Sequence, residues 1–175
     1  FLGGAGSYYT MPRWNDTRPF ETKATDPHTY STDLFGSLAL AAVEDHDLDN
    51  GPLFLYLPWQ AVHAPYDLPP YCQNDTKSCP NQIRSMISDV DGWMRKIVDA
   101  LKRRDMYENT LLVFTSDNGG TQDPVNTSNP GGGNNFPLRG AKHSNWDGGM
   151  RSQTFVSGGF VPVDARGTTN SEFFH

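Results

Sequence analysis

The clearest chemistry in the chain lies where a short apolar run, residues 111–115, gives way to Ser116 and then to Asp117-Asn118-Gly119-Gly120. The run predicts a buried strand, and open α/β sheets bind their ligands at the carboxyl ends of such strands. A carboxylate beside an amide oxygen is the pair of hard ligands that Ca²⁺ or Mg²⁺ prefers, and the glycines allow the backbone to approach a ligand closely. The alternative is an ordinary strand followed by a turn, because Asp-Asn-Gly is also common turn chemistry.

A second residue capable of chemistry, His63, follows another apolar run, 53–57, which is bounded by Pro52 and Pro58. A continuous apolar run of this length predicts a strand that is buried on both faces, as in a parallel sheet. His63 then lies just beyond the carboxyl end of that strand. A lone histidine at such a place is more often structural than catalytic, so both roles stay open at this point.

Two helical patterns position these runs. Cap-forming residues at 30–33 precede an apolar stripe that predicts a helix of about three turns, which ends in the polar segment 45–51. Residues 82–104 carry the strongest helical period in the chain, and they connect the two apolar runs as a crossover would. The two strands are therefore predicted to be parallel, with His63 and Asp117 at one crevice, which favours a functional role for both.

A basic, glycine-rich segment, residues 137–151, follows a long polar loop. Its basic side chains, Lys142 among them, and its glycines suit the binding of an anionic group by side chains and backbone together. The alternative for this segment is a basic surface turn.

Composition narrows the class of partner. The formal net charge of −6 argues against a nucleic-acid-binding protein. No apolar stretch approaches the roughly 18 residues of a membrane span. The length suits one domain with a buried core.

Two cysteines, Cys72 and Cys79, flank a short polar loop and could close a small disulfide. Three N-glycosylation acceptors also appear, at Asn15, Asn74 and Asn126. Together these features favour a protein of the secretory pathway, either lysosomal or secreted. We therefore expect the cysteines to be bridged and not catalytic.

The order of these motifs resembles that of the type I sulfatases, and within them the arylsulfatase B group, which removes sulfate from sulfated sugars. Ordered motifs at such spacings are far more specific than any single one of them. The resemblance covers roughly residues 30–175 and is carried by four stretches, 54–57 with 61–65, 115–120, 132–140 and 142–151.

The resemblance implies an α/β protein of the alkaline-phosphatase-like fold, with a mixed, largely parallel sheet flanked by helices. It implies hydrolysis of a sulfated carbohydrate or aryl sulfate by a formylglycine nucleophile, made from a cysteine in a C-x-P-S-R motif, with Ca²⁺ holding the nucleophile and the sulfate oxygens. Asp117 and Asn118 match the later pair of metal ligands of the family, and His63 and Lys142 match residues that contact the sulfate.

Departures from the family pattern concern its N-terminal motifs. Neither Cys72 nor Cys79 lies in C-x-P-S-R, and an Asp-Asp pair and a K-x-H motif are also absent. In the family these elements precede the motifs found here. We therefore expect residues 1–175 to be the central part of a sulfatase catalytic domain, without the N-terminal nucleophile region and the C-terminal domain.

Two other functions compete with this interpretation. A phosphatase or phosphodiesterase of the same superfamily would be expected to bring more His and Asp ligands for a second metal, whereas only His63 is well placed here. A non-catalytic, glycan- or calcium-binding relic of a sulfatase would lack C-x-P-S-R upstream in the parent chain.

Overall fold

The computed structural model describes residues 7–9, 14–15, 18–19, 30–73, 79, 81–122 and 133–171. The chain divides into two compact units, Phe1–Leu101 and Lys102–His175. Among the residues that the structure describes, none of the helices combines the length and the apolar character needed to cross a membrane.

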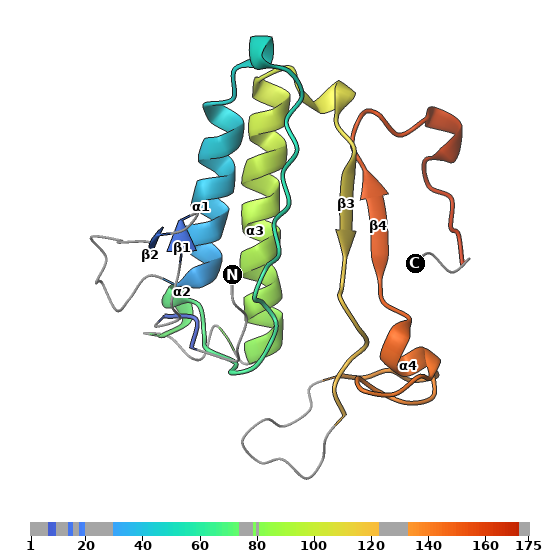
Figure 1. Cartoon of the computed structure of the whole chain (residues 1–175). Coiled ribbons are helices and arrows are strands. Elements are labelled where there is room, and N and C mark those ends of the chain that lie inside the picture. Colours follow the sequence, from blue (N-terminus) through green and yellow to red (C-terminus); the bar gives the residue numbers. More distant parts are fainter. Residues whose placement is uncertain are drawn as a thin grey trace. The chain divides into compact units, whose positions relative to one another are not determined.

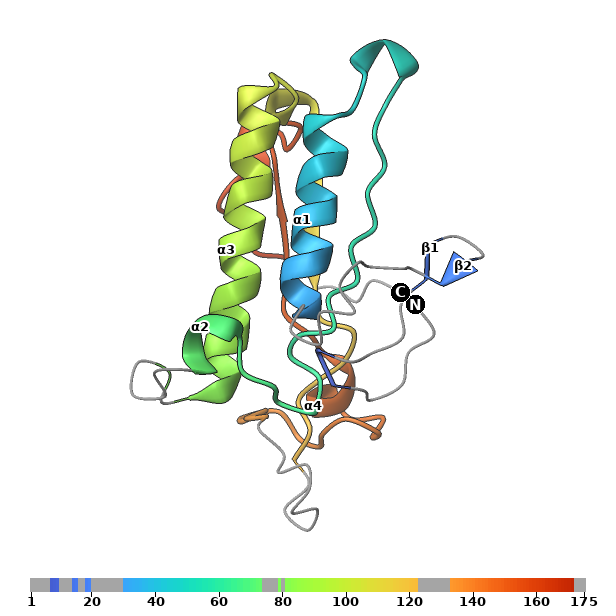
Figure 2. The ribbon, with the colours of Figure 1, turned by 90° about the vertical axis from the view of Figure 1, so that its left-hand side faces the viewer.

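The first unit is built mainly from two helices that run side by side (Figures 1 and 2). Both correspond to the helices predicted from the apolar periodicity, which confirms those predictions. In chain order its elements are β1 (Trp14–Asn15), β2 (Arg18–Pro19), α1 (Ser31–Glu44), the 3₁₀ turn η1 (Leu48–Asn50), α2 (Pro70–Gln73) and α3 (Gln82–Arg103).

The two long helices approach each other through a glycine. A Cβ placed on Gly36 of α1 would lie 2.2 Å from Cδ2 of Trp93 on α3, so only glycine leaves room for that indole ring. The ring nitrogen of Trp93 also donates a hydrogen bond of 2.8 Å to the carboxylate of Asp33, in the first turn of α1. Packing and a hydrogen bond therefore fix the same pair of helices.

The apolar run 53–57 does not form a strand. It belongs to an extended segment that leads from η1 back to α2 beside the two helices (Figure 1), and Phe54 and Tyr56 are 89% and 77% exposed. A strand exists only when a neighbour pairs with its backbone, and none of the described residues does so here. The predicted buried strand is therefore wrong in this structure.

The second unit holds a small antiparallel sheet. The predicted strand after α3 is present as β3 (Leu112–Thr115), although it is not buried as predicted. Its partner is β4 (Thr154–Ser157), with Val113 opposite Val156 and Phe114 opposite Phe155. The two phenylalanine rings stack with their centroids 5.0 Å apart. Among the described residues β3 pairs only with β4, and residues 53–57 form no strand, so the predicted parallel pairing is not found. The elements are η2 (Tyr107–Asn109), β3 (Leu112–Thr115), α4 (Asp147–Met150), β4 (Thr154–Ser157) and η3 (Val163–Ala165).

The core of the first unit is an aromatic cluster at one end of the helix pair. Tyr8, Tyr30 and Met86 are buried together, and the rings of Tyr8 and Tyr30 stack with centroids 5.3 Å apart. Ser31 donates its backbone N–H to the carbonyl oxygen of Tyr8 over 2.8 Å, which satisfies a donor that the start of α1 would otherwise leave open. The cluster thus ties the N-terminal residues 7–9 to both long helices.

Candidate functional site

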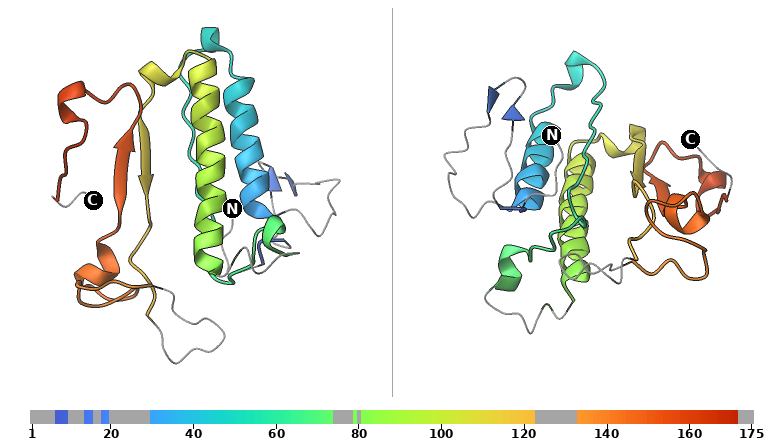
Figure 3. Two further views of the ribbon diagram at one scale, coloured as in Figure 1. Left: turned by 180° about the vertical axis from the view of Figure 1, so that it is seen from behind. Right: turned by 60° about the horizontal axis from the view of Figure 1, so that its bottom comes forward.

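A cluster of loops surrounds the end of β3 within the second unit. In Figures 1 and 3, α4 and the loops before it lie beside the segment that leaves β3. The N–H of Gly119 donates to the carbonyl oxygen of Gly149 over 2.9 Å, and the N–H of Lys142 donates to the carbonyl oxygen of Gly120 over 3.1 Å. Backbone hydrogen bonds therefore bring the segment of Asp117 and Asn118 next to the segment of Lys142.

Glycine is required for these contacts because the backbones touch directly. A Cβ on Gly119 would lie 1.9 Å from the carbonyl oxygen of Gly148, and one on Gly148 would lie 2.2 Å from that of Gly140. Gly140 also has φ of +86°, a conformation that other residues rarely adopt. The glycines of the sequence motifs thus serve close packing between loops.

Asn135 joins the same loops through its side chain. Its amide nitrogen donates to the carbonyl oxygens of Gly120 and Gly140 over 2.9 and 3.2 Å, and its amide oxygen accepts from the N–H of Gly120 over 3.0 Å. The sequence alone predicts no role for Asn135, although it lies in one of the family-like stretches. An asparagine in a glycine-rich loop resembles an ordinary turn residue, so its bridging role depends on the tertiary structure.

Asp117 and Asn118 offer oxygen ligands of the kind that hard cations take. Asp117 is exposed, and the amide nitrogen of Asn118 donates to the carbonyl oxygen of Gly119 over 3.1 Å, which leaves the amide oxygen for another partner. The donor chemistry fits part of a Ca²⁺ shell, which usually has about 6–8 oxygens. Within the described ranges, no group of three or more His, Cys, Asp or Glu side chains could hold a metal.

The basic residues of the second unit differ in how they are held. The side chain of Lys142 is partly buried, whereas the guanidinium of Arg139 lies 3.7 Å from the centre of the Trp146 ring. A cation over an aromatic face is stabilised there, so Arg139 is engaged within its own loop. Lys142 is thus the better candidate of the two for contacting an anionic ligand.

His63 lies in the first unit, exposed on a turn that is closed by a hydrogen bond of 2.8 Å from its N–H to the carbonyl oxygen of Gln60. Its Nδ1 lies 2.6 Å from the carbonyl oxygen of Ala64. Because a carbonyl oxygen only accepts hydrogen bonds, Nδ1 must carry a proton. Nε2 is then the ring nitrogen that can form a hydrogen bond with a ligand. Its proximity to Lys142 and Asp117, which belong to the other unit, stays a prediction.

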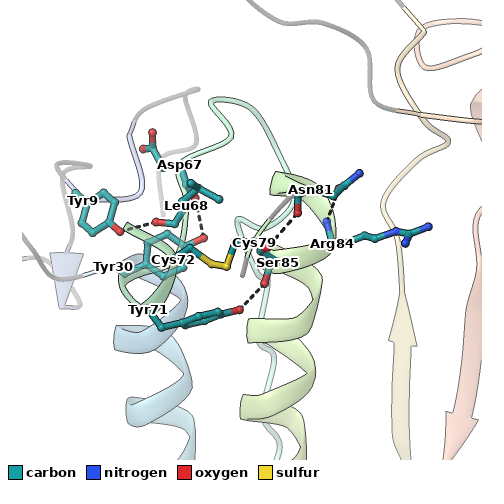
Figure 4. The surroundings of a disulfide bond; sticks show 10 residues. All are labelled: Tyr9, Tyr30, Asp67, Leu68, Tyr71, Cys72, Cys79, Asn81, Arg84 and Ser85. Atoms are coloured by element: carbon teal, nitrogen blue, oxygen red, sulfur yellow. Dashed lines mark hydrogen bonds between the residues drawn. A yellow bond between two sulfur atoms is a disulfide. The ribbon is translucent and has the colours of Figure 1, made fainter. Parts of the chain in front are cut away.

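A disulfide joins Cys72 and Cys79, with their Cα atoms 5.7 Å apart, as the sequence predicted (Figure 4). Both cysteines are buried, and next to them the hydroxyl of Tyr71 donates to the carbonyl oxygen of Ser85 on α3 over 3.0 Å. The bridge therefore supports the connection from α2 to α3. Of the glycosylation acceptors, Asn74 and Asn126 lie outside the described residues, as does the side chain of Asn15.

Shifted pKa values occur in the first unit. Burial raises the pKa of Tyr8 and Tyr30, and burial raises the pKa of Tyr9 to about 12. The pKa of Asp89 is raised to about 6, mainly by burial and next by the nearby carboxylate of Asp33, while the positive charge of Lys96 lowers it by a smaller amount. One carboxylate oxygen of Asp89 is buried with no hydrogen-bond partner among the described residues, beside an open cavity of about 290 Å³. No pattern in the sequence predicts this cavity.

Comparison with known proteins identifies the class. The sulfatase family model matches residues 1–175, so the chain belongs to the sulfatase family, and the resemblance found in the sequence is confirmed. Arylsulfatase J of Mus musculus is 32% identical over 99% of this chain and 30% of its own length. The N-acetylgalactosamine-6-sulfatase of the same species is 30% identical over 69% of this chain and 22% of its own length.

A solved structure is also similar to this chain. Ps i-CgsB in complex with k-i-k-neocarrahexaose is 30% identical, with a TM-score of 0.63, and the match covers 83% of this chain and 31% of that one. The chain thus spans less than a third of the length of the curated and solved relatives it matches.

Proposed function

We propose that the complete protein hydrolyses sulfate esters, and that its substrates are sulfated sugars. Membership of the sulfatase family supports the reaction. The name of the N-acetylgalactosamine-6-sulfatase and the neocarrahexaose bound to Ps i-CgsB support a sulfated carbohydrate as the substrate class. An aryl sulfate would then serve as a convenient artificial substrate.

The observation that carries the proposal is the loop cluster at the end of β3. Hydrogen bonds link Gly119 to Gly149 and Gly120 to Lys142, so one connected set of loops carries Asp117, Asn118 and Lys142. These are the positions that match the metal ligands and a sulfate-contacting lysine of the family. An ordinary strand-to-turn connection would not need this dense set of glycine contacts.

Each residue has a role that suits its chemistry. The ammonium of Lys142 would oppose the negative charge of the sulfate oxygens, which strengthens as the ester bond breaks. His63, with Nδ1 donating to Ala64, would present Nε2 to a sulfate or leaving-group oxygen. Asp117 and Asn118 would hold Ca²⁺, which supplies electrostatic stabilisation of charge on the sulfate when it is bound.

The same proposal covers domain organisation and compartment. Residues 1–175 form the central part of the catalytic domain, of the alkaline-phosphatase-like fold, and the formylglycine nucleophile comes from another part of the protein. We therefore expect residues 1–175 alone to have no sulfatase activity. The buried disulfide, together with the acceptors Asn15, Asn74 and Asn126, supports a lysosomal or secreted protein.

The test is an assay of the complete protein with Ca²⁺ on an aryl sulfate, on sulfated saccharides and on the corresponding aryl phosphate. We expect hydrolysis of the sulfates and a loss of more than tenfold in kcat for Lys142→Ala, since one charge-assisted contact can contribute a few kcal/mol. Lys102→Ala, which removes an exposed lysine at the end of α3, is the matched control and should leave kcat unchanged. Preference for the phosphate would favour the phosphatase alternative, and wild-type rates for Lys142→Ala would refute the site.

A further inference from the structure

The turn that carries His63 is held by hydrogen bonds from the buried phenol of Tyr8. The hydroxyl of Tyr8 lies 2.7 Å from the carbonyl oxygen of His63 and 3.0 Å from that of Gln60. These two carbonyls are the two ends of the turn, because the N–H of His63 itself donates to Gln60. One hydrogen-bond donor thus serves both ends, and the shorter distance is to His63.

Tyr8 is itself fixed at every polar backbone group. Its N–H donates to the carboxylate of Asp67 over 2.9 Å, and its carbonyl oxygen accepts from the N–H of Ser31 over 2.8 Å. Its ring is fully buried and stacks against that of Tyr30. Because Tyr8 is held in this way, its hydroxyl keeps the turn at a fixed place relative to the start of α1.

The turn is also fixed through the side chain of Gln60. The buried hydroxyl of Ser31 donates to the amide oxygen of Gln60 over 2.8 Å. Ser31 therefore holds Tyr8 through its N–H and Gln60 through its hydroxyl. The first residue of α1 and the phenol of Tyr8 define where the turn sits.

The chemistry of Tyr8 suits a permanent donor. Burial raises the pKa of Tyr8, which favours the protonated phenol that can donate. Carbonyl oxygens accept only, so the direction of the hydrogen bond cannot reverse. This differs from a tyrosine that acts as a catalytic acid, whose pKa would have to lie nearer the working pH.

We propose that Tyr8 is a positioning residue, whose phenolic hydroxyl fixes the turn 60–63 so that His63 presents Nε2 to the sulfate ester. The inference rests on the proposed function, because it assumes that His63 contacts the substrate. Tyr8 touches only the backbone of the turn and acts through His63. Removing its hydroxyl should therefore affect the geometry of the reaction more than the binding of the substrate.

The experiment compares Tyr8→Phe with Tyr30→Phe in the complete protein. The two residues are stacked neighbours in the same buried cluster, but the hydroxyl of Tyr30 donates to the carbonyl oxygen of Asp67 over 3.1 Å and not to the turn. We expect Tyr8→Phe to lower kcat for an aryl sulfate by about tenfold or more with little change in KM, since small displacements of a reacting group cost up to about a hundredfold. Tyr30→Phe should stay within about twofold. Equal losses in both variants would overturn the proposal.

A double variant separates positioning from general damage. If Tyr8 acts through His63, Tyr8→Phe should cause no further loss of kcat in a His63→Ala background. A full additional loss there would overturn the proposal. Thermal unfolding of all variants checks that the cluster stays folded.

A spectroscopic measurement keeps this inference distinct from the proposed function. Wild-type rates for His63→Ala would refute the role of His63 in the proposed function. In that case, the ring resonances of His63 in NMR spectra still test positioning, because they should shift in Tyr8→Phe and not in Tyr30→Phe. Unchanged His63 resonances in Tyr8→Phe would overturn the positioning role whatever the activity.

Discussion

The two regions that carry candidate residues are held in place by different means. The turn of His63 rests on side-chain hydroxyls, with Tyr8 and Ser31 bonding its backbone and its Gln60 side chain. The loops of Asp117 and Lys142 rest mainly on backbone-to-backbone contacts that only glycine permits, with the side chain of Asn135 as an added bridge. The first region should therefore be sensitive to the loss of a hydrogen bond, and the second to the gain of a single methyl group.

The two units also differ in which residues they bury. In the first unit, buried residues include tyrosine, methionine, valine and leucine side chains. Among the described residues of the second unit, the buried ones are all glycines, namely Gly119, Gly148, Gly149 and Gly158. The strand residues Val113 and Val156 are 61% and 53% exposed. The second unit therefore depends on loop geometry more than on an apolar core of its own.

The largest expected effect is that of Asp117→Ala in the complete protein. Removing the carboxylate should abolish activity and bound calcium together, because a charged oxygen ligand is lost from the metal shell. Calcium content by mass spectrometry and an aryl sulfate assay measure both. Asp164→Ala, at an exposed position of η3, is the control and should retain calcium. Unchanged calcium in Asp117→Ala would show that Asp117 is not a ligand.

The next effect tests whether the second region depends on glycine. Gly119→Ala would place a methyl 1.9 Å from the carbonyl oxygen of Gly148, so the loops must separate and kcat should fall about a hundredfold. Gly92→Ala on α3 is the matched control, because a Cβ there meets nothing within 4 Å. The control should be neutral or slightly stabilising, as alanine favours a helix. Normal activity in Gly119→Ala would break the contrast between the two regions.

The disulfide gives a smaller, purely structural effect in the first unit. Cys72→Ser with Cys79→Ser should lower the free energy of unfolding by about 2 kcal/mol, since the bridge closes a short loop. Denaturant unfolding of the complete protein measures this, and kcat should be largely retained. Intact-mass analysis after alkylation provides the direct check of the bridge. Two thiols that react in the native, unreduced protein would rule it out.

The smallest effect concerns the buried carboxyl of Asp89. Its pKa is raised to about 6 in the folded protein, above the roughly 3.9 of an unfolded chain, so its contribution to stability is full below about pH 4. That contribution is lost as the pH rises through about 6. Asp89→Asn should therefore be more stable than the wild type at pH 7, by about 1 kcal/mol after allowance for solvent screening, and the difference should shrink toward pH 4.

Unfolding midpoints at pH 4, 5, 6 and 7 test this prediction. Asp91→Asn removes a carboxylate from an exposed position of the same helix and serves as the control. A difference in unfolding midpoint between Asp89→Asn and the wild type that is the same at all four pH values would contradict a raised pKa of the Asp89 carboxyl. It would also weaken the view that the first unit is held by tight burial.

How far the sequence predicted the fold depends on the range of the interactions. The helices at Ser31–Glu44 and Gln82–Arg103 follow from local periodicity and the strand at Leu112–Thr115 from a short apolar run, and all three are present. The predicted burial of that strand is wrong. The apolar run 53–57 has the composition of a buried strand, but composition does not supply a partner. The assignment failed there because pairing is a tertiary property.

The ordered motifs were sufficient to predict the family and to select the candidate residues Asp117, Asn118, Lys142 and His63. Three contacts are visible only in the folded chain: β4 pairs with β3, Asn135 bridges Gly120 and Gly140, and the hydroxyl of Tyr8 bonds the His63 turn. These contacts link distant segments or carry no periodic signal, and each depends on the path of the backbone. A hydrogen bond between a phenol and a carbonyl 55 positions away leaves no trace in local sequence, because it forms only when the path of the backbone brings the two groups together at a suitable distance and angle.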